Sequence, residues 1–206
     1  RKQEEGLKLA VDRYKHEEPY TCIAGYAGTG KSTLVNFIIK ALDIPEEHIA
    51  YCAYTGKASL ILQQKGCPGA TTAHRLLYNT KELPDGTFQH TPRKHPADNL
   101  KLIIVDEISM LEKEQWEILM RWGIPVIALG DPFQLPPIHE DNGVLAHPHV
   151  FLDQVMRQAQ DSEIIRLSMW IREGKPLAQF PCANEQVQIF TQNQVVSGMY
   201  EWADQI

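Results

Sequence analysis

The stretch from Gly25 to Ser32, GYAGTGKS, constrains this chain more than any other, because it matches the pattern G-x-x-x-x-G-K-[ST] at every specified position. The apolar run 20–24 precedes it, and the segment 33–42, with apolar residues at helical spacing, follows it. We therefore expect a buried strand, a glycine-rich loop and a helix. A loop in this context binds the phosphates of a nucleoside triphosphate, because it presents backbone N–H groups at a helix N-terminus.

Each residue type in the loop has a chemical reason to be there. Glycines let the backbone turn tightly and bring N–H groups to phosphate oxygens, where a Cβ would intrude. Lys31 adds positive charge at the outer phosphates, and the Ser32 hydroxyl suits the Mg²⁺ that accompanies them. The alternative is a glycine-rich turn with an accidental Gly-Lys-Ser, which the full pattern disfavours. The expected nucleotide-binding residues here are Gly25, Ala27, Gly28, Thr29, Gly30, Lys31, Ser32 and Thr33.

Composition narrows the class of protein. With 206 residues, 43% of them hydrophobic, the chain can build one substantial core. No apolar run is long enough to cross a bilayer, and the four cysteines form no C-x-x-C pair, so we expect a cytoplasmic protein with reduced thiols. The net charge of -6 provides no general attraction to nucleic acid. Any nucleic-acid binding therefore requires a local groove.

Strand-like and helix-like segments alternate along most of the chain. Besides the strand 20–24 and the helix 33–42, the patterns predict strands over 49–54, 102–105, 126–129 and 187–190, and helices over 3–14, 59–64, 71–77, 113–121, 162–172 and 195–206. This alternation predicts an α/β fold with a mostly parallel sheet flanked by helices.

Residues 78–99 break this alternation. The segment is polar, holds Pro84, Pro92 and Pro96, and contains the turn signal Pro84-Asp85-Gly86. It fits either a small hairpin inserted outside the main sheet or a disordered loop.

Two acidic residues follow the clearest strand. Asp106 and Glu107 come directly after the apolar run 102–105, and the carboxyl ends of parallel strands are where open α/β sheets bind ligands. Asp106 is suited to hold Mg²⁺, and Glu107 to orient or deprotonate a water that attacks the γ-phosphate. The alternative is a solvated strand end, which the phosphate loop in the same sheet makes the weaker interpretation.

Gln134 follows the next strand, in the segment Gly130-Asp131-Pro132-Phe133-Gln134-Leu135-Pro136-Pro137. Its amide can donate to a γ-phosphate oxygen and accept from the attacking water, so it can sense whether that phosphate is present. The two prolines stiffen the segment that follows.

Arg157 is a candidate arginine finger, which neutralises charge in the transition state. Taken alone, an arginine near a helix is more often the partner in a surface ion pair.

Together these motifs resemble the RecD-like and Dda-like branch of the superfamily 1 DNA helicases. The resemblance rests on an ordered set spread over most of the chain: residues 25–32, Thr55-Gly56-Lys57-Ala58, residues 72–77, Asp106-Glu107-Ile108-Ser109-Met110, residues 130–137 and Arg157-Gln158. It implies a RecA-like P-loop NTPase domain that uses ATP and Mg²⁺. It also implies a motor that moves along single-stranded DNA.

The resemblance assigns further roles. Gln3 corresponds to the family's adenine-reading glutamine. Tyr54 replaces the family's proline, and either stacks on a base or fills the strand end. The segment 78–99 falls where the family inserts a strand-separating subdomain, which implies contact with a duplex junction through Lys81, Arg93, Lys94 and His95. The implied DNA-binding residues are Tyr54, Thr55, Gly56, Lys57, Thr72 and His74.

Members of this branch carry a second RecA-like domain. We therefore expect residues 1–206 to form the first, ATP-binding motor domain of a helicase or translocase, with 78–99 as an accessory insertion and the C-terminal motor domain missing from this chain. The alternative is a nucleotide-gated switch that grips a nucleic acid or protein without moving along it. A small-molecule kinase is less favoured, because Asp106, Glu107 and Gln134 together activate water better than they position an acceptor alcohol.

Overall fold

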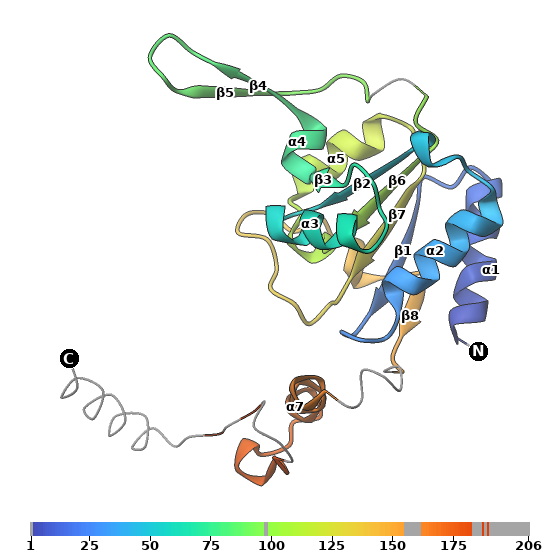
Figure 1. Cartoon of the computed structure of the whole chain (residues 1–206), viewed down its shortest axis with the longest axis vertical. Helices are drawn as coiled ribbons and strands as arrows, with labels where there is room; N and C mark the ends of the chain where they lie inside the picture. The colour runs from blue at the N-terminus through green and yellow to red at the C-terminus, as the bar shows by residue number, and fades with distance from the viewer. Residues whose placement is uncertain (1, 97–98, 155–161, 183–186, 188, 190–206) are drawn as a thin grey trace. The chain divides into compact units, whose positions relative to one another are not determined.

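The predicted phosphate loop connects the first strand of a parallel sheet, β1 (Tyr20–Gly25), to helix α2 (Lys31–Leu42) (Figure 1). The structure, a computed structural model, describes residues 2–96, 99–154, 162–182, 187 and 189. The chain divides into two units, residues 1–154 and residues 155–206, and each is described by itself.

The sheet of the first unit has six strands within the described residues, in the order β3-β2-β6-β7-β1-β8. All neighbouring pairs are parallel, which confirms the expected α/β class. Because parallel strands joined by helical crossovers run in the same direction, the carboxyl ends of β1, β6 and β7 meet at one edge of the sheet. The remaining strands are β2 (Ile49–Ala53), β3 (Thr71–Thr72), β6 (Leu102–Asp106), β7 (Val126–Gly130) and β8 (Val150–Leu152).

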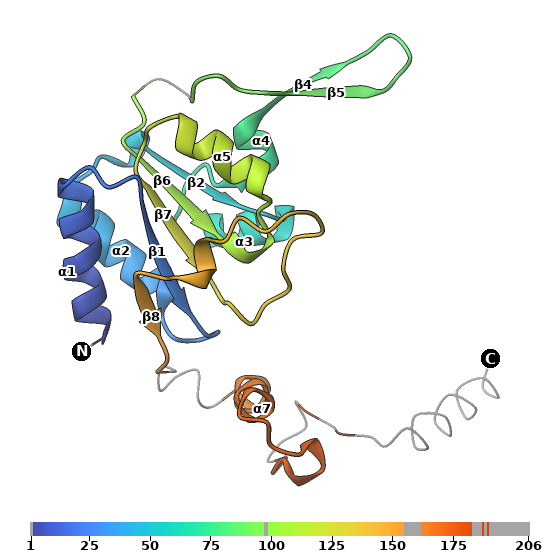
Figure 2. The same ribbon diagram turned by 180° about the vertical axis from the view of Figure 1, so that it is seen from behind.

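Alternate residues of β1, β2, β6 and β7 enter two separate hydrophobic clusters. Ile23 and Ile104 pack with helices α1 (Lys2–Lys15), α2 and α3 (Gly56–Gln64) on one face. Cys22 and Ile103 pack with α4 (Ala73–Leu77) and α5 (Lys113–Arg121) on the other, so helices cover both faces (Figures 1 and 2). A sheet covered on both faces explains why these strands are continuously apolar. The short 3₁₀ turns are η1 (Glu46–His48), η2 (Ile108–Met110) and η3 (Val144–Ala146).

The polar insertion contains a two-stranded antiparallel hairpin of β4 (Tyr78–Glu82) and β5 (Phe88–Pro92), which projects away from the main sheet (Figure 1). The Asp85 carboxylate closes its turn by accepting from the backbone N–H and the hydroxyl of Thr87, at 2.9 and 2.6 Å. Of the two alternatives that the sequence left open, the structure supports the hairpin.

Three local features differ from the sequence prediction. Helix α3 begins at Gly56, because the Thr55 hydroxyl oxygen accepts from the backbone N–H of Ala58 at 3.1 Å and caps the first turn. Thr71–Thr72 forms a two-residue strand, and Thr72 caps α4 as expected. Strand β8 was not predicted, because three residues are too few to show a period.

The second unit contains α7 (Glu163–Arg172), which confirms the helix predicted over 162–172, and the 3₁₀ turn η4 (Leu177–Gln179). The Trp170 indole N–H donates to the Pro176 carbonyl at 2.9 Å, and its ring packs edge-on against Phe180. The expected strand 187–190 and helix 195–206 lie outside the described residues, apart from positions 187 and 189. Among the described helices, none combines the length and apolarity that a membrane span requires.

The Gly130→Ala substitution tests how tightly the end of β7 is packed. A Cβ at Gly130 would lie 2.7 Å from Cγ2 of Ile108 and 2.9 Å from Cδ1 of Leu145. We expect the free energy of unfolding, measured by urea denaturation, to fall by about 1–3 kcal/mol. Gly56→Ala is the matched control, because no heavy atom lies within 4 Å of its added Cβ. An equal loss in both variants would contradict this packing.

Candidate nucleotide-binding site

Two glycines give the phosphate loop its shape. Gly28 and Gly30 have φ angles of 75° and 84°, in the left-handed region that costs other residues about 1–2 kcal/mol. Gly30 is also the N-cap of α2, where the backbone N–H groups of the first helical turn have no intrahelical acceptor. The loop and the helix start thus form a concave set of donors suited to an anion.

The packing of β8 gives a reason for Gly25 that the sequence did not indicate. A Cβ at this position would lie 2.6 Å from the carbonyl oxygen of Leu152 and 2.9 Å from Oγ1 of Thr29. Its φ angle is not among the positive ones. The close approach of β8 and of Thr29 therefore excludes a side chain at Gly25.

The Lys31 ammonium is held beside the loop by the loop's own carbonyl groups. Its Nζ donates to the oxygens of Gly25 at 2.6 Å and Tyr26 at 3.1 Å. A phosphate oxygen placed on the loop would lie within reach of the same ammonium. This geometry fits the charge-neutralising role that the motif predicts.

Helix α1 brings Gln3 to the loop. Its Nε2 donates to the carbonyl of Thr29 at 3.0 Å, and the Thr29 hydroxyl donates to the Tyr26 carbonyl at 2.8 Å. The predicted adenine-reading residue and the phosphate loop are therefore in contact. The other predicted nucleotide-binding residues are Ala27, exposed in the loop, and Ser32 and Thr33, in the first turn of α2.

Asp106 and Glu107 lie at the end of β6. Glu107 has a φ angle of 57°, unusual for a side chain with a Cβ, and its N–H donates to Oδ1 of Asp106 at 3.0 Å. Burial raises the pKa of Asp106, against the opposing effects of this hydrogen bond and of the Lys31 charge. Burial, and then the charge of Asp106, raise the pKa of Glu107.

The site offers oxygen ligands to a divalent cation. The charge of Lys31 lowers the pKa of the Asp106 carboxylate, which places the two groups near each other. Ser32 follows Lys31 directly in α2. A carboxylate and a hydroxyl are the ligand types that Mg²⁺ prefers in proteins. The buried carboxylate would also gain a partner for its negative charge.

Gln134 lies beside the acidic segment. Its Oε1 accepts from the Ser109 hydroxyl at 3.5 Å, and Ser109 belongs to η2, which begins immediately after Glu107. The buried Asp131 shapes the loop, because its carboxylate accepts from the N–H of Phe133 at 3.0 Å and its carbonyl accepts from the N–H of Gln134 at 3.0 Å.

An aromatic cluster joins the phosphate loop to the Gln134 loop. The ring of Tyr26 lies 5.6 Å from that of Phe133 and 5.4 Å from that of Phe151, centroid to centroid. We did not predict this contact, because Tyr26 occupies an unspecified position of the motif. Together with the Ser109 contact, it places the loop of Lys31, the acids and Gln134 in one connected site.

The candidate DNA-binding residues follow two neighbouring strands at the same edge of the sheet. Thr55 caps α3, with Gly56 and Lys57 exposed after it, and Thr72 caps α4. A threonine oxygen that accepts from a helix N–H keeps its hydroxyl hydrogen for an outside acceptor. Tyr54 is half-buried after β2. The exposed His74 stacks on Tyr78 at 4.7 Å and lies 4.4 Å from His90, between ring centroids.

Arg157, the candidate arginine finger, lies outside the described residues.

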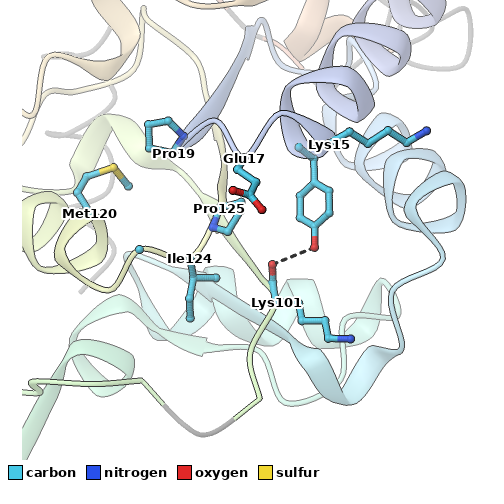
Figure 3. Close-up of a pocket in the computed structure, with 9 residues that line it drawn as sticks. Lys15, Glu17, Pro19, Lys101, Met120, Ile124 and Pro125 are labelled. Atoms are coloured by element: carbon cyan, nitrogen blue, oxygen red, sulfur yellow. Dashed lines mark hydrogen bonds between the residues drawn. The ribbon is translucent and has the colours of Figure 1, made fainter.

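A separate pocket of 630 Å³ lies at the amino ends of the strands, where Pro19, Lys101 and Pro125 precede β1, β6 and β7 (Figure 3). The Tyr14 hydroxyl donates to the Lys101 carbonyl across it at 3.3 Å. Its lining includes none of the predicted site residues that the structure describes, and those at the ends of β1, β2, β6 and β7 lie at the opposite edge of the sheet.

Comparisons with known proteins agree with this geometry. A family model described as an AAA domain matches residues 4–194. The ATP-dependent RecD2 DNA helicase of Deinococcus radiodurans is 33% identical over 161 residues, covering 74% of this chain and 22% of the relative. The ATP-dependent DNA helicase dda of Enterobacteria phage T4 is 26% identical over 180 residues, covering 80% of this chain and 38% of the relative. The chain thus spans well under half the length of these two relatives.

Solved structures support the fold. The Pif1 helicase of Candida albicans aligns with a TM-score of 0.57 at 22% identity, covering 100% of this chain and 54% of that one. A Bacteroides Pif1 in complex with ADP-AlF4 aligns with a TM-score of 0.54 at 20% identity, covering 94% of this chain and 54% of that one. The parallel sheet is therefore of the RecA-like P-loop type. The family match, together with the ordered motifs, shows that the chain belongs to the AAA domain family, in the RecD-like and Pif1-like branch of the superfamily 1 helicases.

Proposed function

We propose that this chain is the ATP-binding half of an ATP-dependent DNA helicase or translocase, which couples ATP hydrolysis to movement on single-stranded DNA. The observation that carries the proposal is the set of contacts that join Lys31, the acidic pair and Gln134 at one edge of the sheet. Its similarity to proteins named ATP-dependent DNA helicases supports the same function.

The nucleotide chemistry follows from the geometry. Lys31 and the loop N–H groups hold the phosphates, and Gln3 reads the base. Mg²⁺ held by Ser32 and Asp106 would neutralise phosphate charge. Glu107 takes a proton from the attacking water, and its raised pKa makes it a stronger base than an ordinary glutamate.

The pairing of β2 with β6 supports the proposed link between the DNA contacts and the acids. Asp106 pairs in register with Ala53 of β2, so Tyr54 and the following residues leave the sheet next to Glu107. Gln134 connects to Glu107 through Ser109 and to the phosphate loop through Phe133. Loss of the terminal phosphate would thus be communicated to the segments that grip a strand.

In the proposed motor, Arg157 acts as the arginine finger and a second RecA-like domain faces this one. We also propose that the protein is cytoplasmic. Charge developing on the transferred phosphoryl group needs donors from both sides. We therefore expect residues 1–206 by themselves to bind Mg²⁺–ATP and to hydrolyse it slowly, because the proposed second domain would supply the remaining donors.

A switch that binds nucleic acid or protein without translocating is the alternative, and the net charge of -6 is the observation that favours it. Steady-state ATP turnover of the full-length protein, measured with and without single-stranded DNA, separates the two. A motor is stimulated by orders of magnitude, whereas a switch is not.

The Lys31→Ala variant tests the phosphate site. Loss of a charged hydrogen-bond donor, at about 1.5–3 kcal/mol, weakens affinity about 10- to 100-fold. Isothermal titration calorimetry with Mg²⁺–ATP measures this. Lys40→Ala is the control, since Lys40 is an exposed lysine in the last turn of the same helix. Unchanged affinity in Lys31→Ala would remove the basis of the proposal.

The Glu107→Gln variant tests the general base. We expect single-turnover hydrolysis, with protein in excess over labelled ATP, to slow by about 10²–10⁴-fold, while the Kd for Mg²⁺–ATP changes little. Glu114→Gln, an exposed glutamate on α5, should leave the rate unchanged. Wild-type turnover in Glu107→Gln would assign the base elsewhere.

The Asp106→Asn variant tests how much the buried, charged carboxylate lowers the stability of the fold. A raised pKa means that the folded chain holds the proton more tightly than the unfolded chain, so stability without Mg²⁺ should rise as pH falls from neutral toward the ordinary value of 3.8. Asp106→Asn should raise the melting temperature at neutral pH by a few degrees and flatten this pH dependence. A lower melting temperature at neutral pH would show that the charge is stabilising.

A further inference from the structure

A second pocket, of 460 Å³, lies beside the edge strand β3 and is not used by the nucleotide chemistry. Its walls come from the end of α3, from α4 and from the chain that returns from the hairpin. The residues that line it include Gln63, Thr71, Arg75, Leu76 and Arg93. We call it the arginine pocket, after Arg75 and Arg93.

The arginine pocket is locally positive in an acidic protein. Two guanidinium groups line it, and none of the described residues that line it carries a carboxylate, while the whole chain has a net charge of -6. A guanidinium keeps its charge at any relevant pH and offers N–H donors in a fork that matches the oxygens of a phosphate. The pocket therefore suits an anion.

Arg93 is fixed at the base of the hairpin by three hydrogen bonds. Its backbone N–H donates to the Leu77 carbonyl at 2.7 Å, and its carbonyl accepts from the Trp122 indole N–H at 3.2 Å. Its Nε donates to the Tyr78 carbonyl at 3.3 Å, which orients the half-buried side chain. The sequence grouped Arg93 with Lys81, Lys94 and His95, but those three are exposed.

The opposite walls are also fixed. Arg75 lies in the first turn of α4, and its N–H is held by the Thr72 cap at 3.2 Å. The Gln63 amide donates to the Ala70 carbonyl at 2.6 Å, which closes the turn between α3 and β3. The pocket is thus formed by positioned backbone, with one exposed and one half-buried arginine.

We propose that the arginine pocket binds a backbone phosphate of a nucleic-acid strand as the strand passes from Thr72 and His74 toward the hairpin. This inference rests on the proposed function. Arg75 follows His74 directly, and the residue whose carbonyl orients Arg93 is Tyr78, on which His74 stacks. The pocket therefore continues the proposed DNA surface to the base of the insertion. Phosphate contacts of this kind position a strand without reading its sequence.

The test measures binding of a fluorescent single-stranded oligonucleotide to the whole chain by anisotropy at several salt concentrations. The variants are Arg75→Gln, Arg93→Gln and the double substitution, with Arg121→Gln on α5, outside the pocket, as control. We expect about tenfold weaker binding for each single variant and no change for Arg121→Gln. In the double variant the slope of log affinity against log salt should fall by about 0.7, the value for one phosphate on a single strand.

Two further arms keep the test decisive. Arg93→Lys retains the charge and should keep most of the salt slope, and melting temperatures identify any variant that fails to fold. Titration with inorganic phosphate at matched ionic strength tests for a free-anion site. If the double variant loses phosphate binding but keeps oligonucleotide binding, the inference is wrong.

The two proposals fail in different ways. A wild-type chain that binds Mg²⁺–ATP but no oligonucleotide would contradict the proposed motor function. A wild-type chain that binds the oligonucleotide with the same affinity and salt slope as the double variant would contradict the arginine pocket alone. Mg²⁺–ATP affinity should be equal in all variants, because the pocket and the nucleotide site share no residue.

Discussion

The nucleotide site depends on how closely β8 approaches β1. The Leu152 carbonyl oxygen lies only 2.6 Å from the position that a Cβ of Gly25 would take, and it also accepts from the N–H of Tyr26 at 3.3 Å. The loop is thereby attached to an outer strand at its first residues and to α2 at its last. A loop fixed at both ends holds its N–H groups in position before any anion arrives, which is the physical basis of a preorganised site.

The site stores unfavourable interactions that its proposed ligands relieve. Asp106 is a carboxylate drawn into a poorly solvated position, and Glu107 is held in left-handed backbone next to it. Lys31 offsets part of the charge of Asp106, while its ammonium also donates to carbonyls of the loop. Such a site costs the fold some stability in exchange for affinity, as is common at functional sites.

The sequence predicted the sheet, the loop and the acids because each depends on a local pattern: apolar runs of four or five residues, a complete motif, or a strand followed by carboxylates. The sequence also predicted that Thr72 caps α4, because a helix cap depends only on neighbouring residues. The role of Gly25 could not be predicted, since it depends on Leu152, far along the chain, and β8 is too short to show a pattern. The arginine pocket could not be predicted for the same reason, because the hairpin separates its two arginines in the sequence.

The Tyr26 ring touches both Phe133 and Phe151, so three segments share one packing contact. Substitutions at these positions will not behave independently, because residues in contact have coupled energies. A smaller residue at position 26 would remove the ring contact with Phe133 and so weaken the packing between the phosphate loop and the Gln134 loop. Any redesign of the phosphate loop in this protein must therefore replace the three aromatic side chains as a set.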